Sequence, residues 1–305
     1  MTDEIAFLNA LLRLELTVVN QQFIHILALR QRGDEMRASR IYAVDRIDFP
    51  NALAIIDHLV AVGGLQPLAS EPPRPGHVLA ALLAAEAALE ERLRVALEDL
   101  SMFSGVARRL AETAARPRAA YRDWLDQERH GQEQDGQEQR GATAEDAVAE
   151  KGETGIDRLF SCLIALIEQM MIHAFIYRQA GCADEADIAW ATSGIAMVQA
   201  GDLVTALSGL GMMPRPAASP LLATALEPAA ARRSDQRLIA AYAVIARETA
   251  MAVTLPETLS ALCRRIADAS NRLARWQQGA PHPALMLCAA SFKSFEATLT
   301  KFLSG

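Results

Sequence analysis

The sequence is poor in aromatic residues and in basic charge, and its cysteines are not closely spaced. Phe, Trp and Tyr make up 5% of the 305 residues, and this shortage, together with an excess of Ala, Leu, Glu and Arg, favours helix over strand. The four cysteines include no Cys-x-x-Cys pair, which argues against a zinc site and a disulfide framework. The net charge of −7 gives no electrostatic support to nucleic-acid binding.

Motifs of the common catalytic classes are also missing. The sequence has no Gly-rich phosphate loop, no nucleophile elbow and no His-Glu-x-x-His pattern. Hydrophobic residues nevertheless make up 51% of the chain, which is enough for a sizeable core. These totals predict a helical protein with a packed interior and exclude a chain that is disordered throughout.

The most apolar stretch, residues 159–177, contains Glu168, Gln169 and His173 and is followed by Arg178. A membrane span rarely contains such residues, so we expect a helix that is buried on most sides. The N-terminus is acidic where a signal peptide would be basic. We therefore expect a cytoplasmic protein without a membrane span.

One segment, residues 129–154, differs from the rest in composition. It is rich in Gln, Glu and Gly, almost lacks large apolar residues, and has seven acidic residues against three basic ones. Such a segment cannot bury enough surface to offset its ordering entropy, which predicts a flexible acidic linker. The linker would separate a first domain, residues 1–128, from a second, residues 155–305.

Hydrophobic periodicity predicts long helices in both halves and no strand. Gly and Pro clusters mark the boundaries between them. The expected helices cover residues 5–29, 34–62, 77–100 and 106–126 in the first half, then 156–180, 185–210, 234–253 and 257–278 in the second. A further amphipathic stretch covers residues 282–302.

The two halves resemble each other. Phe-Ile-His at 23–25 and Arg-Gln-Arg-Gly at 30–33 recur, 148 positions later, as Met-Ile-His at 171–173 and Arg-Gln-Ala-Gly at 178–181. The order of the expected helices is also the same. A tandem duplication of a four-helix bundle accounts for both observations.

The first half also resembles bacterioferritin, a member of the ferritin-like superfamily. The likeness is strongest in Leu-Asn-Ala-Leu-Leu-Arg-Leu-Glu-Leu at 8–16 and Asn-Gln-Gln-Phe-Ile-His at 20–25. It continues less closely to about residue 128, and the second half is related only through the first. The resemblance implies two ferritin-like bundles packed as an intramolecular pseudo-dimer.

Ferritin-like di-iron sites take one Glu from each of two helices and a Glu-x-x-His pair from each of the other two. By the resemblance, Glu15 and Glu86 correspond to the single carboxylates. The second-helix pair falls on Asp48 and Asn51, with Pro50 between them, and the fourth-helix pair falls on Arg118 and Tyr121. Three carboxylates of four and neither histidine remain.

Two interpretations of these residues stay open. Glu15, Asp48 and Glu86 could form a residual site for iron or manganese. Alternatively, Arg118 could pair with Glu15 and Glu86 and supply the positive charge that iron supplies in the family. Tyr121 could donate a hydrogen bond to the same carboxylates.

The second half lacks the ligand set. The matching positions are approximately Leu163, Ile195, Val198, Tyr242, Ser270 and Leu273. Such a lining predicts a packed core without metal. His25 and His173, which are equivalent by the repeat, could face each other across a pseudo-twofold axis or form hydrogen bonds at the bundle interface.

These observations favour a non-catalytic ferritin-like scaffold or binding subunit that acts with a protein partner or as a homo-oligomer, without a cofactor. The alternative is an iron-binding or ferroxidase-type di-metal protein with one site in the first bundle. Whether the protein is an enzyme therefore depends on that site.

Overall fold

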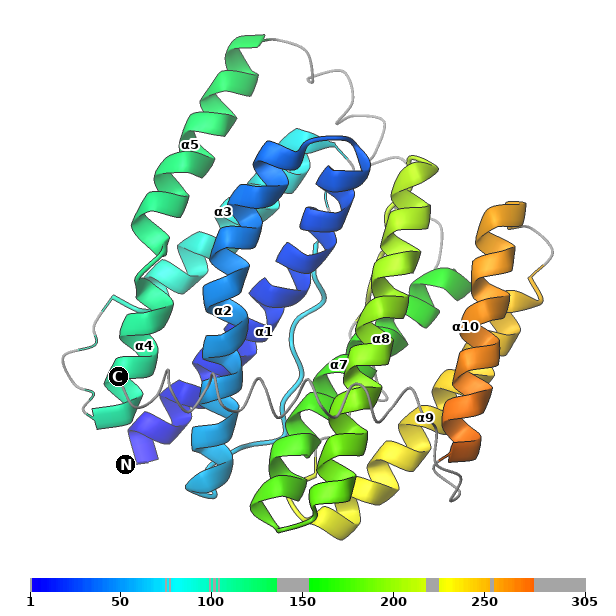
Figure 1. Ribbon diagram of the computed structural model, residues 1–305. Helices are drawn as coiled ribbons and strands as arrows, with labels where there is room; N and C mark the ends of the chain where they lie inside the picture. The colour runs from blue at the N-terminus through cyan, green and yellow to red at the C-terminus, as the bar shows by residue number, and fades with distance from the viewer. Residues whose placement is uncertain are drawn as a thin grey trace. The chain divides into compact units, whose positions relative to one another are not determined.

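The computed structural model describes residues 2–135, 154–217, 225–252 and 255–276, except residues 75, 77, 99, 101, 102 and 104. Every regular element in these ranges is an α-helix, which confirms the all-α class (Figure 1). The chain divides into two compact units. One comprises Met1–Ile55, Ser70–Glu153 and Leu207–Arg215, and the other Ile56–Ala69, Thr154–Ala206 and Pro216–Gly305.

The helices of the first half are α1 (Thr2–Gln31), α2 (Glu35–Ala61), α3 (Leu79–Ala96), α4 (Gly105–Ala115) and α5 (Arg118–Asp135). The single helix predicted over residues 106–126 is therefore two. Pro117 explains the break, because proline lacks an N–H and disfavours the helical conformation of the preceding Arg116. Pro50, in contrast, lies inside a continuous α2.

The first residues of the predicted acidic linker are helical, because α5 continues to Asp135. The rest of that segment, residues 136–153, lies outside the described residues. The predicted helix over 282–302 also lies outside them.

The helices of the second half are α7 (Gly155–Gln179), α8 (Ala183–Gly209), α9 (Pro228–Ala250) and α10 (Glu257–Trp276). Thr154 caps α7 in a reciprocal capping box with Asp157. Helix α9 begins before the predicted residue 234, with Pro228 in its first turn, where a missing N–H costs nothing.

Helix α7 is the one described helix that is long and apolar enough to cross a membrane by length and composition. Its most apolar window is buried throughout. Core helices of globular bundles have this character. The described part of the chain therefore gives no clear membrane span.

Four glycines end the first two helices of each half. Gly33, Gly63, Gly181 and Gly211 all have φ between 66° and 76°, the left-handed region that favours glycine. After each one, the next residue donates its N–H to a carbonyl five residues back, for example Asp34 to Leu29 and Cys182 to Tyr177. These are Schellman ends, and Gly33 and Gly181 are separated by the same 148 positions as the sequence repeat.

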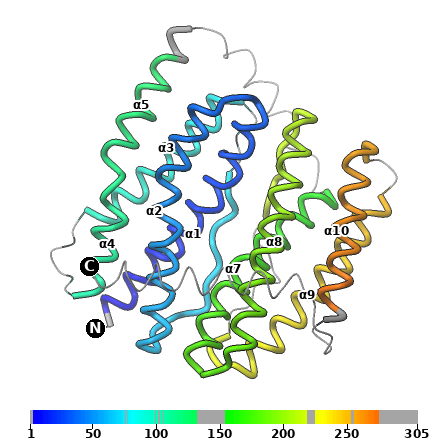
Figure 2. Tube along the Cα trace, viewed as in Figure 1, coloured from blue at the N-terminus to red at the C-terminus, as the bar shows by residue number. Residues whose placement is uncertain are grey.

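The first-half helices enclose an apolar core to which α1, α2, α3 and α5 all contribute. It is built from Ile26, Leu29, Ala38, Ile41, Val44, Leu82, Leu83, Tyr121 and Leu125. The long connection from α2 to α3 returns along α1 (Figure 2), where Glu71 and Arg74 donate backbone N–H groups to Thr17 and Gln21. This packing positions the polar groups described next.

Candidate functional site

A buried arginine lies in the interior of the first-half bundle. Arg118 is the first residue of α5, and its side chain is 3% exposed. Its Nη2 donates to Asp48 Oδ1, its Nη1 donates to Glu90 Oε1, and its Nε donates to the Ala114 carbonyl at 2.8 Å. We call Glu15, Asp48, Glu90 and Arg118 the arginine cluster.

Glu15 differs from the other carboxylates of this cluster. It is fully buried on α1, and neither of its carboxylate oxygens has a hydrogen-bond partner. The Asn51 amide lies near enough to favour the charged form of Glu15 but outside hydrogen-bond geometry. One oxygen of Asp48, one of Glu90 and the amide of Gln22 are likewise buried without a hydrogen-bond partner.

Burial dominates the electrostatics of the arginine cluster. It raises the pKa of Glu90 to about 7 and that of Asp48 to about 6, although Arg118 opposes both shifts. Burial also raises the pKa of Glu15 well above its ordinary value, and the neighbouring Asp48 adds to this shift. Three carboxylates thus share one permanent cation, and a carboxylate without a partner favours its neutral form.

A second group of polar side chains adjoins the first and is centred on Glu86. His25 Nδ1 lies 2.5 Å from Glu86 Oε1, Tyr121 donates to Oε2 at 2.8 Å, and Gln21 donates to Oε1 at 3.4 Å. The Gly76 N–H donates to His25 Nε2 at 3.4 Å. Since a backbone N–H can only donate, Nδ1 carries the ring proton and donates it to Glu86. We call Gln21, His25, Glu86 and Tyr121 the first histidine cluster.

The second half contains a matching group, the second histidine cluster. Asp235 on α9 accepts hydrogen bonds from Gln169 at 2.8 Å, from His173 Nδ1 at 2.6 Å and from Tyr177 at 2.7 Å. The Ala225 N–H donates to His173 Nε2 at 3.0 Å. In both halves, therefore, a Gln and a His one turn apart on the first helix bind the same carboxylate. The His also accepts a hydrogen bond from the backbone of the connection that leads to the helix with that carboxylate.

Among the described residues of the second half, the arginine cluster has no charged counterpart. Leu163, which is 148 positions after Glu15, is fully buried, and Tyr242 donates to Gln199 at 2.5 Å. The predicted positions on α8 were wrong by one residue, because Val198 is 65% exposed and Ile195 is only partly buried. Ala196 and Gln199 are the buried residues that correspond to Asp48 and Asn51.

The structure separates residues that the sequence had grouped. Glu15, Asp48 and Arg118 belong to one cluster, whereas Glu86 is held by His25 and Tyr121. Arg118 does point into the bundle, but its carboxylate partners are Asp48 and Glu90 instead of Glu15 and Glu86. Tyr121 donates to Glu86, as anticipated. Both ring nitrogens of His25 and of His173 form hydrogen bonds with groups of their own half, so the two histidines do not bind each other.

Sequence reasoning missed Glu90. It lies one helical turn after Glu86 on α3, and both are buried on an otherwise apolar face with Leu82, Leu89 and Leu93. Two acidic residues at i and i+4 on such a face are a signal that both side chains point inward. That signal could have identified Glu90 as a cluster member.

These side chains do not fit a di-iron centre. A guanidinium occupies the place between Asp48 and Glu90, and Glu86 already accepts hydrogen bonds from three donors. Asn51 offers only a neutral amide. Among the described residues, no group of three or more His, Cys, Asp or Glu side chains is arranged to hold a metal ion. Of the carboxylates in the two clusters of the first half, Glu15 is the one without a hydrogen bond.

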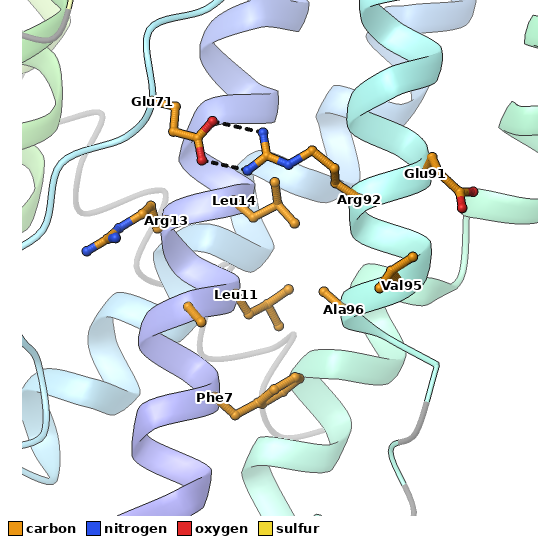
Figure 3. A pocket seen from close by; sticks show the side chains of 10 residues that line it. Phe7, Leu11, Arg13, Leu14, Glu71, Glu91, Arg92, Val95 and Ala96 are labelled. Carbon is orange, nitrogen blue, oxygen red and sulfur yellow. Dashed lines mark hydrogen bonds and ion pairs between the residues drawn. The ribbon is translucent and has the colours of Figure 1, made fainter.

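The first-half unit also has an open groove between α1 and α3, away from both clusters (Figure 3). Its volume is about 530 Å³, and Phe7, Leu11 and Leu14 of α1 face Val95 of α3 across it. A bidentate ion pair between Arg92 and Glu71 lies at one end. Its largely apolar lining and its exposure suit contact with another apolar surface more than chemistry.

Comparison of the chain with protein-family models, with curated proteins and with solved structures gives no significant match.

Proposed function

We propose that the protein is a non-catalytic ferritin-like scaffold or binding subunit in which a buried arginine takes the place of the family's metal ions. One observation carries the proposal: Arg118 donates to carboxylates of two other helices, Asp48 on α2 and Glu90 on α3. A permanent cation that is already paired with two carboxylates repels a metal ion from the same place. The interior is therefore suited to holding helices together.

The second half supports the same proposal. Its corresponding interior is closed by Leu163, Ala196 and the Tyr242–Gln199 hydrogen bond. The two histidine clusters and the paired Schellman glycines support descent of both halves from one duplicated bundle. Packing of the halves as a pseudo-dimer is part of this proposal, because fusion would make a family-type contact intramolecular.

As a scaffold, the protein would act through assembly with further copies of itself or with a protein partner. Light scattering of the purified chain tests the first possibility. We expect the mass of two or more chains of 33.0 kDa each. A mass that stays at one chain over a range of concentrations would leave a different protein as the partner. Native mass spectrometry of the protein purified from its own cells would then have to show a second component in fixed stoichiometry. If that component is missing as well, the scaffold proposal fails.

The alternative is an iron-binding, ferroxidase-type protein with one site in the first bundle, and Glu15 is the observation that favours it. A buried carboxylate without hydrogen bonds is costly unless it is neutral or binds a cation. Glu15 with one oxygen each of Asp48 and Glu90 would supply the ligands. On this alternative, iron or manganese would be bound tightly.

Metal content per chain distinguishes the two proposals. The protein would be loaded anaerobically with ferrous iron, desalted and analysed for iron and manganese, together with Glu15→Gln and the exposed control Glu91→Gln. The scaffold proposal expects substoichiometric metal that neither substitution changes. Metal near one or two ions per chain that is lost in Glu15→Gln and kept in Glu91→Gln would contradict the scaffold proposal and support the alternative.

A further inference from the structure

Two hydrogen bonds from its backbone attach the connection between α8 and α9 to helix α7. The Ala217 N–H donates to Ser161 Oγ at 2.9 Å, and the Ala225 N–H donates to His173 Nε2 at 3.0 Å. All four residues belong to the same unit. The two acceptors differ in chemistry, because a serine hydroxyl does not titrate, whereas an imidazole changes its charge in the physiological pH range.

The two hydrogen bonds of His173 require a neutral ring. Nδ1 lies 2.6 Å from Asp235 Oδ1 on α9, and Nε2 accepts from a backbone N–H, which can only donate. The ring is therefore held as the neutral tautomer with its proton on Nδ1. A protonated imidazole carries a hydrogen on both nitrogens and has no acceptor. It can keep the bond to Asp235 but not the bond to Ala225.

The ring is fully buried, so a positive charge on it needs a counter-ion. Asp235 is placed to supply one, and its second oxygen accepts a hydrogen bond from Tyr177 of α7 at 2.7 Å. Near Tyr177, Arg232 of α9 and Glu185 of α8 form an ion pair at 2.6 Å, so their charges largely cancel. A protonated ring would therefore form a charge-assisted hydrogen bond with Asp235.

The Ala225 N–H can find another partner when this acceptor is lost. Ala225 is half-buried, and the next two residues, Leu226 and Glu227, are exposed. Glu227 is also the charged residue nearest to Ala225 in the sequence. An N–H at such a position can turn towards water, which avoids an unsatisfied donor in the interior. Ala217 keeps its serine acceptor in either state of the ring.

We infer that the His173–Ala225 hydrogen bond is an acid-sensitive latch. When His173 takes up a proton, the connection leaves α7 at Ala225 and stays attached at Ala217. The connection is then held at two points when the ring is neutral and at one when it is charged. This inference is independent of the proposed function, because it involves the second unit alone and no residue of the arginine cluster.

Amide hydrogen exchange of the full chain, followed by NMR between about pH 8 and 5 and corrected for the intrinsic effect of pH, measures each attachment separately. Opening of the latch takes up one proton. We therefore expect the corrected exchange of the Ala225 amide to accelerate by about tenfold for each unit of decreasing pH, until His173 is fully protonated. The Ala217 amide should keep its corrected rate. Corrected exchange at Ala225 that does not depend on pH would refute the inference.

His173→Gln tests the role of the imidazole. A glutamine amide can donate to Asp235 and accept from Ala225, and it does not titrate. We expect the corrected exchange of Ala225 to become independent of pH in this variant. The matched control is His130→Gln, at an exposed histidine of α5, which should keep the pH dependence of the unchanged protein. A dependence that persists in His173→Gln would assign the effect to another group and overturn the inference.

NMR of the ring nitrogens of the unchanged protein, labelled with ¹⁵N-histidine, tests the same inference without a substitution. We expect His173 to carry its proton on Nδ1 at neutral pH and to titrate at the pH at which Ala225 loses protection. A proton on Nε2 at neutral pH, or a titration at a different pH, would contradict the latch. Simultaneous loss of protection at Ala217 would show that acid opens the unit as a whole, and it would also overturn the inference.

Discussion

At the scale of single residues, the arginine cluster shows how a bundle can keep carboxylates in its interior without metal. Arg118 keeps its charge in all conditions relevant to a folded protein, since Asp48 and Glu90 raise its pKa although burial opposes the charge. The cost of burying each ion is offset only while its partners stay in place. Removing one partner should therefore destabilise the bundle more than replacing the whole cluster with apolar residues.

Arg118→Met should lower the free energy of unfolding by roughly 3–5 kcal/mol at pH 8, because it leaves Asp48 and Glu90 buried without a cation. Urea denaturation measures this loss. The loss should shrink towards pH 5, where both carboxylates take up protons. Arg108→Met is the matched control: Arg108 pairs with Glu112 on the surface, and such pairs contribute about 0–1 kcal/mol. Equal effects of the two substitutions would show that the Arg118 pairs contribute no more than a surface pair.

The residue types of the cluster were largely predictable, but the pairing was not. Glu15, Asp48 and Arg118 could be identified because the resemblance to bacterioferritin aligns them with ligand positions of that family. The choice between Glu86 and Glu90 depends on the position of α3 along its axis, because the two residues share one helix face and adjacent turns look alike in sequence. In the structure Glu86 accepts a hydrogen bond from His25, and Glu90 accepts one from Arg118.

At the scale of helices, the two histidine clusters attach a long connection to the first helix of each half. His25 and His173 each use one nitrogen for a carboxylate and the other for a backbone N–H of that connection. Polar groups at this depth destabilise a bundle when they lose their partners. The clusters therefore hold helix α3 or α9 to the helix that begins its half.

Substitutions at the second histidine cluster should rank by the number of hydrogen bonds that they remove. Asp235→Ala leaves three buried donors without an acceptor, and we expect a loss of at least about 3 kcal/mol, at roughly 1–3 kcal/mol for each unsatisfied group. Tyr177→Phe removes one donor and should cost about 1 kcal/mol. Thermal unfolding followed by circular dichroism compares the two. A cost for Tyr177→Phe as large as that for Asp235→Ala would contradict this additive account.

Most helix ends were predictable because glycine and proline have strong local effects. Gly33, Gly181 and Gly211 end helices close to where the sequence suggests. The break at Pro117 was missed, since the apolar period continues across it and hides the lost backbone hydrogen bond. The one-residue error on α8 arose in the same way: Ile195, Ala196, Val198 and Gln199 can all satisfy a loose apolar period, and only packing decides which of them are buried.

At the scale of the whole molecule, the arginine cluster should make stability depend on pH. The pKa of Asp48 is about 6 and that of Glu90 about 7 in the folded protein, against ordinary values of 3.8 and 4.5. Between about pH 4 and 7 the folded protein therefore holds protons that the unfolded chain has released. The resulting stabilisation is complete below the unfolded pKa values and is lost as the pH rises through the folded ones.

We expect the free energy of unfolding to fall as the pH rises from 5 to 8, because over that range the folded protein gives up protons that the unfolded chain has already released. Urea denaturation over that range measures the slope. The double variant Asp48→Asn, Glu90→Gln should have a shallower slope, whatever its absolute stability, whereas Asp45, whose pKa burial raises to about 7, keeps its own contribution. A slope that persists unchanged in the double variant would assign the effect to other groups.

The sequence predicted the all-helical class well because helical periodicity is a local property that repeats over many turns. Only the structure located the cores of the two halves, since which helix faces meet depends on contacts between residues far apart in the chain. Residues 129–135 illustrate the limit: their composition is that of a linker, yet they extend α5. Composition indicates how much surface a segment can bury. It does not show whether the segment extends a helix that begins before it.

The position of Arg118 has a consequence for how the first bundle reaches a single arrangement. Its guanidinium bonds to α2, α3 and the end of α4 at once, so none of these bonds forms fully until all three helices are in place. Sliding α5 by one turn would bury two carboxylates without their cation, whereas a one-turn slip of α10 in the second half would exchange mainly apolar contacts. The cluster thus selects one axial register for the first bundle, and we expect the second bundle to tolerate exchange of its core residues more readily.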